Sequence, residues 1–176
     1  MLTLDWFTPT FSKVILYNSV KLGVIKTLNV GDDVQSFVPF DERFIMGGNG
    51  IPYGNALRGY PDNAIGPQTV SGQAVGGNSM GRVVTELRFP LSENPVIYVM
   101  AFGEMGNVWN TSALTEPFYI DRFSSISMKK SAGVGVRFFM PGIGKLGFDM
   151  GYGFDDITGD GEAQGWEYTI TFGQTF

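Results

Sequence analysis

The side chains that could do chemistry in this sequence are few. Histidine and cysteine are absent, which removes the commonest general base, the thiol nucleophile, disulfides and the usual metal ligands. Paired carboxylates would have to do all the acid–base work of a hydrolase. The chain also contains no phosphate-binding glycine loop, dinucleotide fingerprint or Gly-x-Ser-x-Gly elbow. These absences predict a protein that is not an enzyme and that binds no cofactor.

One acidic segment, residues 155–162, has oxygen donors that could hold calcium. Its Asp, Thr and Glu side chains lack the spacing of an EF-hand loop, so the segment is more typical of a solvated hairpin loop. We therefore predict no metal site there.

The composition points towards lipid and away from nucleic acid. Hydrophobic residues make up 43% of the chain, aromatic residues 14% and charged residues only 16%, and there are 25 glycines. The charged fraction is well below the roughly 25% of ordinary soluble domains. A net charge of −5 provides no basic face for phosphates. The chain is suited to placing apolar side chains outward into a lipid bilayer.

Strict alternation of apolar and polar residues predicts β-strands near the C-terminus. In the last segment, residues 164–176, the apolar row occupies even positions and includes Trp166, Tyr168, Ile170, Phe172 and Phe176, whereas the odd positions are polar or glycine. Segments 131–140 and 145–154 repeat the pattern. Less regular strands are expected near 2–8, 13–29, 80–90 and 95–106, which gives about seven in all.

The connections between these strands alternate in length. Short turns at 8–12, 91–94 and 141–144 alternate with long segments at about 30–79 and 107–130 and a medium one at 155–163. Short turns on one side and long loops on the other are typical of transmembrane β-barrels, whose aromatic rows face lipid and whose small and polar rows face the lumen. We predict an all-β antiparallel meander that forms part of such a barrel. The start of the chain lacks the features of a signal peptide, which indicates a fragment.

Several motifs, taken in order, resemble the barrel of BamA-like outer-membrane assembly factors, the bacterial surface antigen family. The clearest is Leu57-Arg58-Gly59-Tyr60, which is similar to the Arg-Gly-aromatic motif of the family's long lumen loop; the spacing from Gly48 to Arg58 is longer than in proteobacterial members. The other similar segments are 39–44, 47–48, 65–67, 76–80, 85–87, 104–109 and 172–176.

The resemblance implies that residues 1–176 are the C-terminal portion of an outer-membrane barrel domain, with a lumen-directed loop at about 30–79. It implies folding and insertion of nascent outer-membrane proteins in the bacterial outer membrane, with accessory assembly lipoproteins as partners. An incoming strand would add by edge pairing at a weak seam between the first and last strands of the barrel. This chain has the last strand, 164–176, and lacks the first, and on the last strand we single out Tyr168, Ile170, Phe172, Gly173 and Phe176. The alternative is a transport barrel, such as a two-partner secretion translocator or a porin.

The motif also suggests a site. By itself Arg58 resembles an ordinary loop arginine, but Gly59 and Tyr60 follow it, and Glu86 and Glu104 lie on two neighbouring strands. Strand parity turns Glu86 inward, and we choose the phase that also turns Glu104 inward, because a carboxylate should not face lipid. A guanidinium between two inward carboxylates can bind both. We predict that the loop sets Arg58 against both glutamates.

Overall fold

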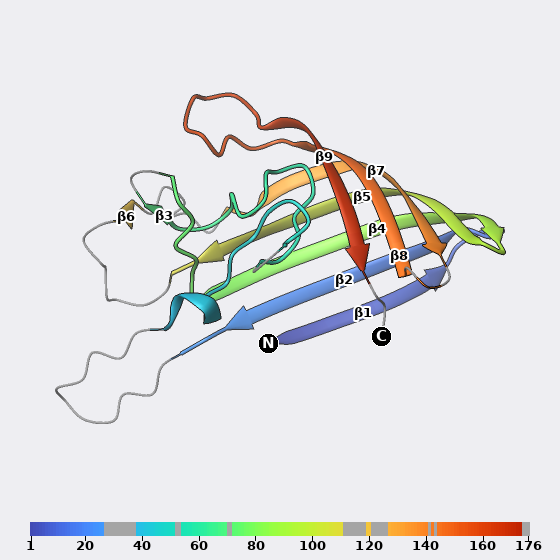
Figure 1. Ribbon diagram of the computed structural model, residues 1–176, viewed down its shortest axis with the longest axis horizontal. Helices are drawn as coiled ribbons and strands as arrows, with labels where there is room; N and C mark the ends of the chain where they lie inside the picture. Colours follow the sequence, from blue (N-terminus) through green and yellow to red (C-terminus); the bar gives the residue numbers. More distant parts are fainter. Residues whose placement is uncertain are drawn as a thin grey trace.

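The computed structural model describes residues 1–26, 38–51, 54–69, 72–110, 119–120, 127–140, 142 and 144–173. Its main element is a seven-stranded antiparallel sheet whose strands follow one another in chain order, as Figure 1 shows. The meander predicted from the sequence is confirmed. The strands are β1 (Leu2–Pro9), β2 (Ile15–Val24), β4 (Ser79–Glu93), β5 (Val96–Trp109), β7 (Lys129–Met140), β8 (Gly144–Gly153) and β9 (Gly165–Gly173).

Among the described residues, three small elements lie outside the main sheet. The two-residue strands β3 (Gln68–Thr69) and β6 (Tyr119–Ile120) pair with each other, and a 3-10 helix spans Phe40–Glu42. In the part of the chain that the structure describes, no helix is long and apolar enough to cross a membrane.

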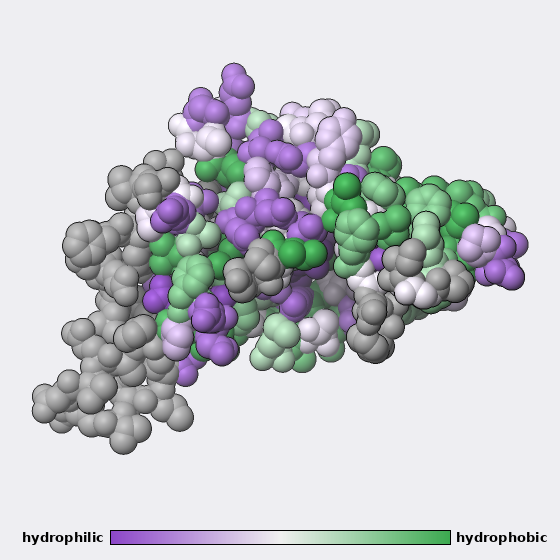
Figure 2. Space-filling model, viewed as in Figure 1, coloured by the Kyte–Doolittle hydropathy of each residue, from purple (hydrophilic) through white to green (hydrophobic). Residues whose placement is uncertain are grey.

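The connections alternate in length as predicted. Only a few residues separate β1 from β2, β4 from β5 and β7 from β8, whereas long segments follow β2 and β5 and a medium one follows β8. The short turns therefore all lie at the same end of the strands, and the long loops lie at the opposite end. In Figure 2, hydrophobic residues gather over the half of the sheet nearest these turns, and hydrophilic residues gather around the long loops.

The two aromatic rows lie on the same face of the sheet, as predicted. Tyr152 pairs directly with Trp166, and Met150 pairs with Tyr168. The side chains of this outer face are exposed, with Tyr168 at 77% and Phe172 at 65% of their full accessible surface. On the opposite face of the same strands Asp149 and Thr169 are buried. In the sheet of a soluble protein the aromatic side chains are usually buried and the polar ones exposed. Here the aromatic side chains are exposed and the polar side chains on the opposite face are buried.

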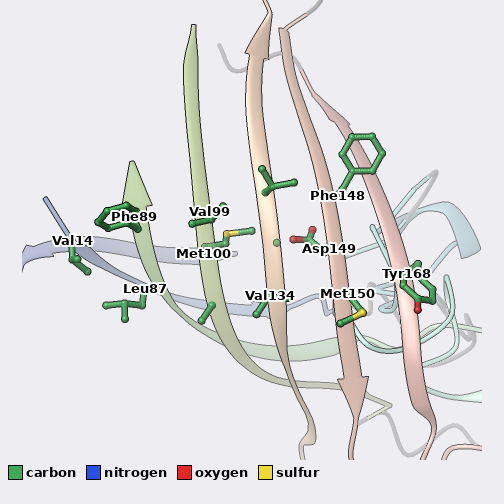
Figure 3. A pocket seen from close by; sticks show the side chains of 13 residues that line it. Val14, Leu87, Phe89, Val99, Met100, Val134, Phe148, Asp149, Met150 and Tyr168 are labelled. Atoms are coloured by element: carbon green, nitrogen blue, oxygen red, sulfur yellow. The ribbon is translucent and has the colours of Figure 1, made fainter. Parts of the chain in front are cut away.

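The outer face also carries an apolar groove of about 770 Å³. Figure 3 shows Phe89 on one side of it and Phe148 and Tyr168 on the other, with the smaller Val99 and Val134 between them. The groove exists because small side chains occupy the middle of the cross-strand row and large ones its ends.

The second strand is shorter than predicted. It ends at Val24 rather than near residue 29, and residues 27–29 lie outside the described part of the chain. Its partner β4 begins at Ser79, which pairs with Val24, and beyond this pair the Ile25 amide donates to the Asn78 carbonyl oxygen (2.8 Å). The apolar residue Ile25 follows Val24, so the apolar pattern of the sequence extends beyond the last register pair of β2 and β4.

Candidate functional site

The described parts of the segment between β2 and β4, here called the lumen loop, lie against one face of the sheet (Figure 1). Three of its residues contact strands that are far apart in the sheet. Asn55 accepts a hydrogen bond from Lys21 on β2 (2.6 Å), Arg58 binds carboxylates on β4, β5 and β8, and Asn49 donates to the Ile170 carbonyl oxygen on β9 (3.1 Å). One compact loop reaches strands from β2 to β9 only because the sheet curls around it.

Arg58 lies between the two glutamates named from the sequence. Its Nε donates to Glu104 Oε1 (2.7 Å) and its Nη2 to Glu86 Oε1 (2.6 Å), and a further bond joins Nη2 to Glu104. The Arg58 backbone amide donates to Glu104 Oε2 (3.1 Å). All three residues are buried, with Arg58 only 5% exposed. The predicted ion pair and the inward phase of Glu104 are both confirmed.

A third carboxylate, which the sequence prediction did not include, completes the site. Asp149 on β8 lies 3.5 Å from Arg58 Nη1 and receives a bidentate pair from Arg137 on β7 (2.8 and 2.7 Å). Its side chain is fully buried. The alternation of apolar and polar residues in 145–154 already placed Asp149 on the inner face. Its odd position in that pattern was therefore the one feature of the sequence that could have indicated it. Parity alone does not show that the sheet brings β8 within reach of Arg58.

The ion cluster contains more arginines than carboxylates among the described residues. Each of its three carboxylates binds two arginines: Glu86 binds Arg58 and Arg88, Glu104 binds Arg58 and Arg82, and Asp149 binds Arg58 and Arg137. Burial alone would lower the pKa of Arg58, but Glu104, Glu86 and Asp149 more than offset it, so the pKa of Arg58 lies above its ordinary value. Carboxylates saturated by arginines act as a structural anchor rather than as general bases.

The guanidinium also packs on an aromatic ring. Arg58 Cζ lies 3.7 Å from the centre of the Phe102 ring on β5, which is close enough for a cation–π contact. The Phe102 ring has room because its neighbour across the sheet is Gly133, where an added Cβ would lie 2.6 Å from Phe102 Cζ. The ring therefore supports the face of the guanidinium while the carboxylates bind its edges.

Gly59 is required by its conformation and by its surroundings. Its φ of +84° is rarely adopted by residues with a side chain, and a Cβ there would lie 2.9 Å from Ser131 Cβ and 3.0 Å from the Tyr152 carbonyl carbon. The inner face of β8 beneath it is also glycine: a Cβ on Gly151 would lie 2.8 Å from the Gly59 nitrogen. The loop backbone rests directly on the backbone of the sheet.

Tyr60 joins the loop to the hairpin between β8 and β9. Its hydroxyl donates to the Lys130 carbonyl oxygen (2.6 Å), accepts from the Asp155 amide (3.3 Å) and lies 3.0 Å from Asp155 Oδ2. Burial and the Asp155 carboxylate raise the pKa of Tyr60 well above its ordinary value, which keeps the hydroxyl protonated. The ring belongs to the buried apolar cluster of Met46, Leu57, Tyr60, Ile65, Met80 and Val108.

The residues named on the terminal strand are separate from this cluster. Tyr168, Ile170 and Phe172 are exposed on the outer face, and Gly173 is the last residue of β9. Phe176 lies outside the described residues. Within the described part of the chain β9 pairs with β8 alone, so its other edge carries no strand.

The acidic hairpin 155–162 is held together by its own backbone. The Asp156 carboxylate accepts bonds from the amides of Thr158, Gly159 and Gly161 (2.7–2.9 Å). The amides of Gly159 and Gly161 lower the pKa of Asp156 below its ordinary value. Across the described residues, no group of three or more Asp or Glu side chains is arranged to hold a metal ion.

Comparisons with known proteins agree with this geometry. A family model described as the Omp85 superfamily domain matches residues 2–176. A crystal structure of BamA from Haemophilus ducreyi, lacking POTRA domains 1–3, is similar with 22% sequence identity and a TM-score of 0.69. The match covers 96% of this chain and 34% of the solved BamA chain, so it spans about a third of the length of that solved chain. The fold of this chain is therefore similar to that of part of the solved BamA chain.

Proposed function

Because the chain belongs to the Omp85 superfamily, we propose that residues 1–176 form the C-terminal portion of an outer-membrane β-barrel domain that helps to fold and insert other barrel proteins. The protein then resides in the bacterial outer membrane, with its lumen loop at about 30–79 inside the barrel. Its partners are the lipid bilayer, nascent outer-membrane proteins and accessory assembly lipoproteins.

The outer face supports the contact with lipid. Its aromatic rows on β8 and β9 are exposed, and the opposite face is polar and buried. Asn18 on β2 and Thr85 on β4 interrupt the apolar face, and they bond to each other, since Thr85 donates to Asn18 Oδ1 (3.0 Å). This hydrogen bond lowers the cost of placing the two polar groups in hydrocarbon.

The observation that carries the proposal is the combination of a fixed loop and an open strand edge. The ion cluster around Arg58 fixes the lumen loop to β4, β5 and β8, while β9 has a free edge in the described part of the chain. An unpaired strand edge is a template for strand addition. The anchored loop holds β4, β5 and β8 in one arrangement, and β8 is the strand that pairs with β9. A nascent strand paired to β9 would continue the same outward aromatic row.

The proposal is tested by inserting the complete natural protein into phospholipid vesicles and adding an unfolded eight-stranded outer-membrane barrel. We expect faster folding of that substrate than in empty vesicles, measured by its resistance to protease and by its shifted gel migration. The variant Arg58→Ala, which leaves three carboxylates without their shared arginine, should lose most of the acceleration. Ion conductance or release of a soluble cargo, with no acceleration of barrel folding, would instead identify a transport barrel.

A further inference from the structure

In the part of the chain that the structure describes, the Asn49 side chain joins the lumen loop to the edge of the terminal strand by a hydrogen bond. Asn49 Nδ2 donates a hydrogen bond to the carbonyl oxygen of Ile170 on β9, at 3.1 Å, across 121 residues of sequence. This contact lies apart from the ion cluster, and neither residue takes part in that cluster.

The Ile170 carbonyl points away from β8, as the hydrogen-bonding pattern of the sheet requires. In an antiparallel ladder the backbone groups of successive residues point alternately to one neighbour and to the other. The Phe154 amide donates to the Lys130 carbonyl oxygen (3.0 Å), so the even residues of β8 point to β7. Phe148 is one of these, and it is the register partner of Ile170. Ile170 therefore directs its amide and carbonyl to the free edge of β9.

The loop fixes the Asn49 side chain in this orientation. Asn49 Oδ1 accepts a bond from the Ile51 amide (2.8 Å), which leaves the NH₂ group directed at β9. The Asn49 amide in turn donates to Asp62 Oδ1 (2.9 Å). The donor is thus held at the edge by the loop's own bonds and not by a freely rotating side chain.

We propose that Asn49 guards the edge of β9: it occupies one of the acceptor groups that an incoming strand must use, so strand addition past Ile170 requires this bond to break. The inference rests on the proposed function, because it concerns how strand addition at that edge is regulated. The lumen loop and the incoming strand then compete for one carbonyl, and whatever shifts the loop away from β9 favours docking of the strand.

The test uses the complete protein in phospholipid vesicles and a synthetic peptide with the sequence of residues 165–173 that carries a photo-cross-linking group. Capture of the peptide at β9 is measured by cross-linking yield and mass spectrometry. Asn49→Asp keeps the acceptor for Ile51 and removes the donor to Ile170, and Asn49→Ala removes both without adding charge. Asn55→Asp is the matched control, because Asn55 lies in the same loop but bonds to Lys21 on β2.

We expect both Asn49 variants to raise capture about threefold to tenfold, the factor that one net hydrogen bond is worth, and Asn55→Asp to leave it unchanged. Equal capture by the wild-type protein and both Asn49 variants would overturn the role of Asn49 and leave the proposed function standing. No capture at β9 in any variant would overturn the proposed function and the guard together.

Discussion

The backbone of Gly59 lies on the backbone of Gly151, so closely that a Cβ on Gly151 would be 2.8 Å from the Gly59 amide nitrogen. Gly151→Ala should therefore push the lumen loop off the sheet, because the atoms it meets are backbone atoms that cannot rotate away. We expect a cost of about 1–3 kcal/mol, typical of overpacking. Hydrogen exchange of residues 44–51 and 54–66 should rise. Gly103→Ala is the control, since a Cβ there meets nothing within 4 Å; equal effects of both substitutions would contradict the packing.

Arg58→Ala should destabilise the loop more than any other arginine substitution in it. Removing one partner of a buried ion pair costs about 3–5 kcal/mol, and water in a lumen reduces that figure. The cost arises because Glu86, Glu104 and Asp149 repel one another once the shared guanidinium is gone. Adding Glu104→Gln should recover part of the loss. Urea unfolding in detergent measures both.

Arg43→Ala provides the comparison for that series. Arg43 lies in the same loop but donates to the Val38 carbonyl oxygen (2.9 Å) rather than to a carboxylate. A loss as large as that of Arg58→Ala, or no recovery with Glu104→Gln, would argue against the ion cluster as the anchor.

Tyr60→Phe should weaken the attachment of the lumen loop to β7 and to the hairpin between β8 and β9 by about 1 kcal/mol. The Lys130 carbonyl on β7 loses its hydroxyl donor, and Asp155 in the hairpin loses its bonds to the hydroxyl. The effect depends on pH. Since the folded pKa of Tyr60 is raised above the ordinary value of 10.0, its stabilisation is complete below pH 10.0 and is lost as the pH rises beyond it. The wild-type protein should therefore lose stability in alkali more steeply than Tyr60→Phe does. Tyr168→Phe, on the exposed outer face, is the control and should leave the stability of the loop and hairpin unchanged.

Val134→Arg should destabilise the protein in lipid vesicles by about 2–4 kcal/mol, the cost of a basic residue on the lipid face near the midplane. Val134 is exposed on the outer face of β7. Thr171→Arg places the same side chain on the inner face of β9, where it should be tolerated. Equal urea midpoints for the two variants would contradict the assignment of the faces.

Much of the fold can be predicted from period-two alternation. Parity on strands 145–154 and 164–176 determines which side chains share a face, and it also turns Glu86 inward. The apolar residues of the strand that carries Glu104 fit either phase, and the rule that a carboxylate should not face lipid was needed to turn Glu104 inward. Parity does not predict where a strand ends, as at Val24, because the apolar residue Ile25 follows the last register pair of β2 and β4. Nothing in the alternation of β2 marks the point where β4 begins.

The candidate site could be predicted only in part for a related reason. Arg58 and its two glutamates lie on the loop and two adjacent strands, so the motif, the parity of Glu86 and the exclusion of Glu104 from lipid together predict the contact. Asp149 lies two strands beyond β5, and the distance from there to Arg58 depends on how strongly the sheet curls. The Asn49 contact depends on the conformation of the loop itself, which has no periodic signal.

The order of residues in the ion cluster constrains when it can form. Arg58 precedes Glu86, Glu104 and Asp149 by 28, 46 and 91 residues, so every partner is added after the arginine in the direction of synthesis. Arg58 cannot bind all three carboxylates until β8, which carries Asp149, has joined the sheet. Bringing together residues that are this far apart in the sequence is slow. An Arg58 side chain that binds all three carboxylates therefore shows that the sheet has formed as far as β8. A chain that stops folding earlier lacks the Asp149 contact, and its lumen loop is less firmly held and more accessible to proteases.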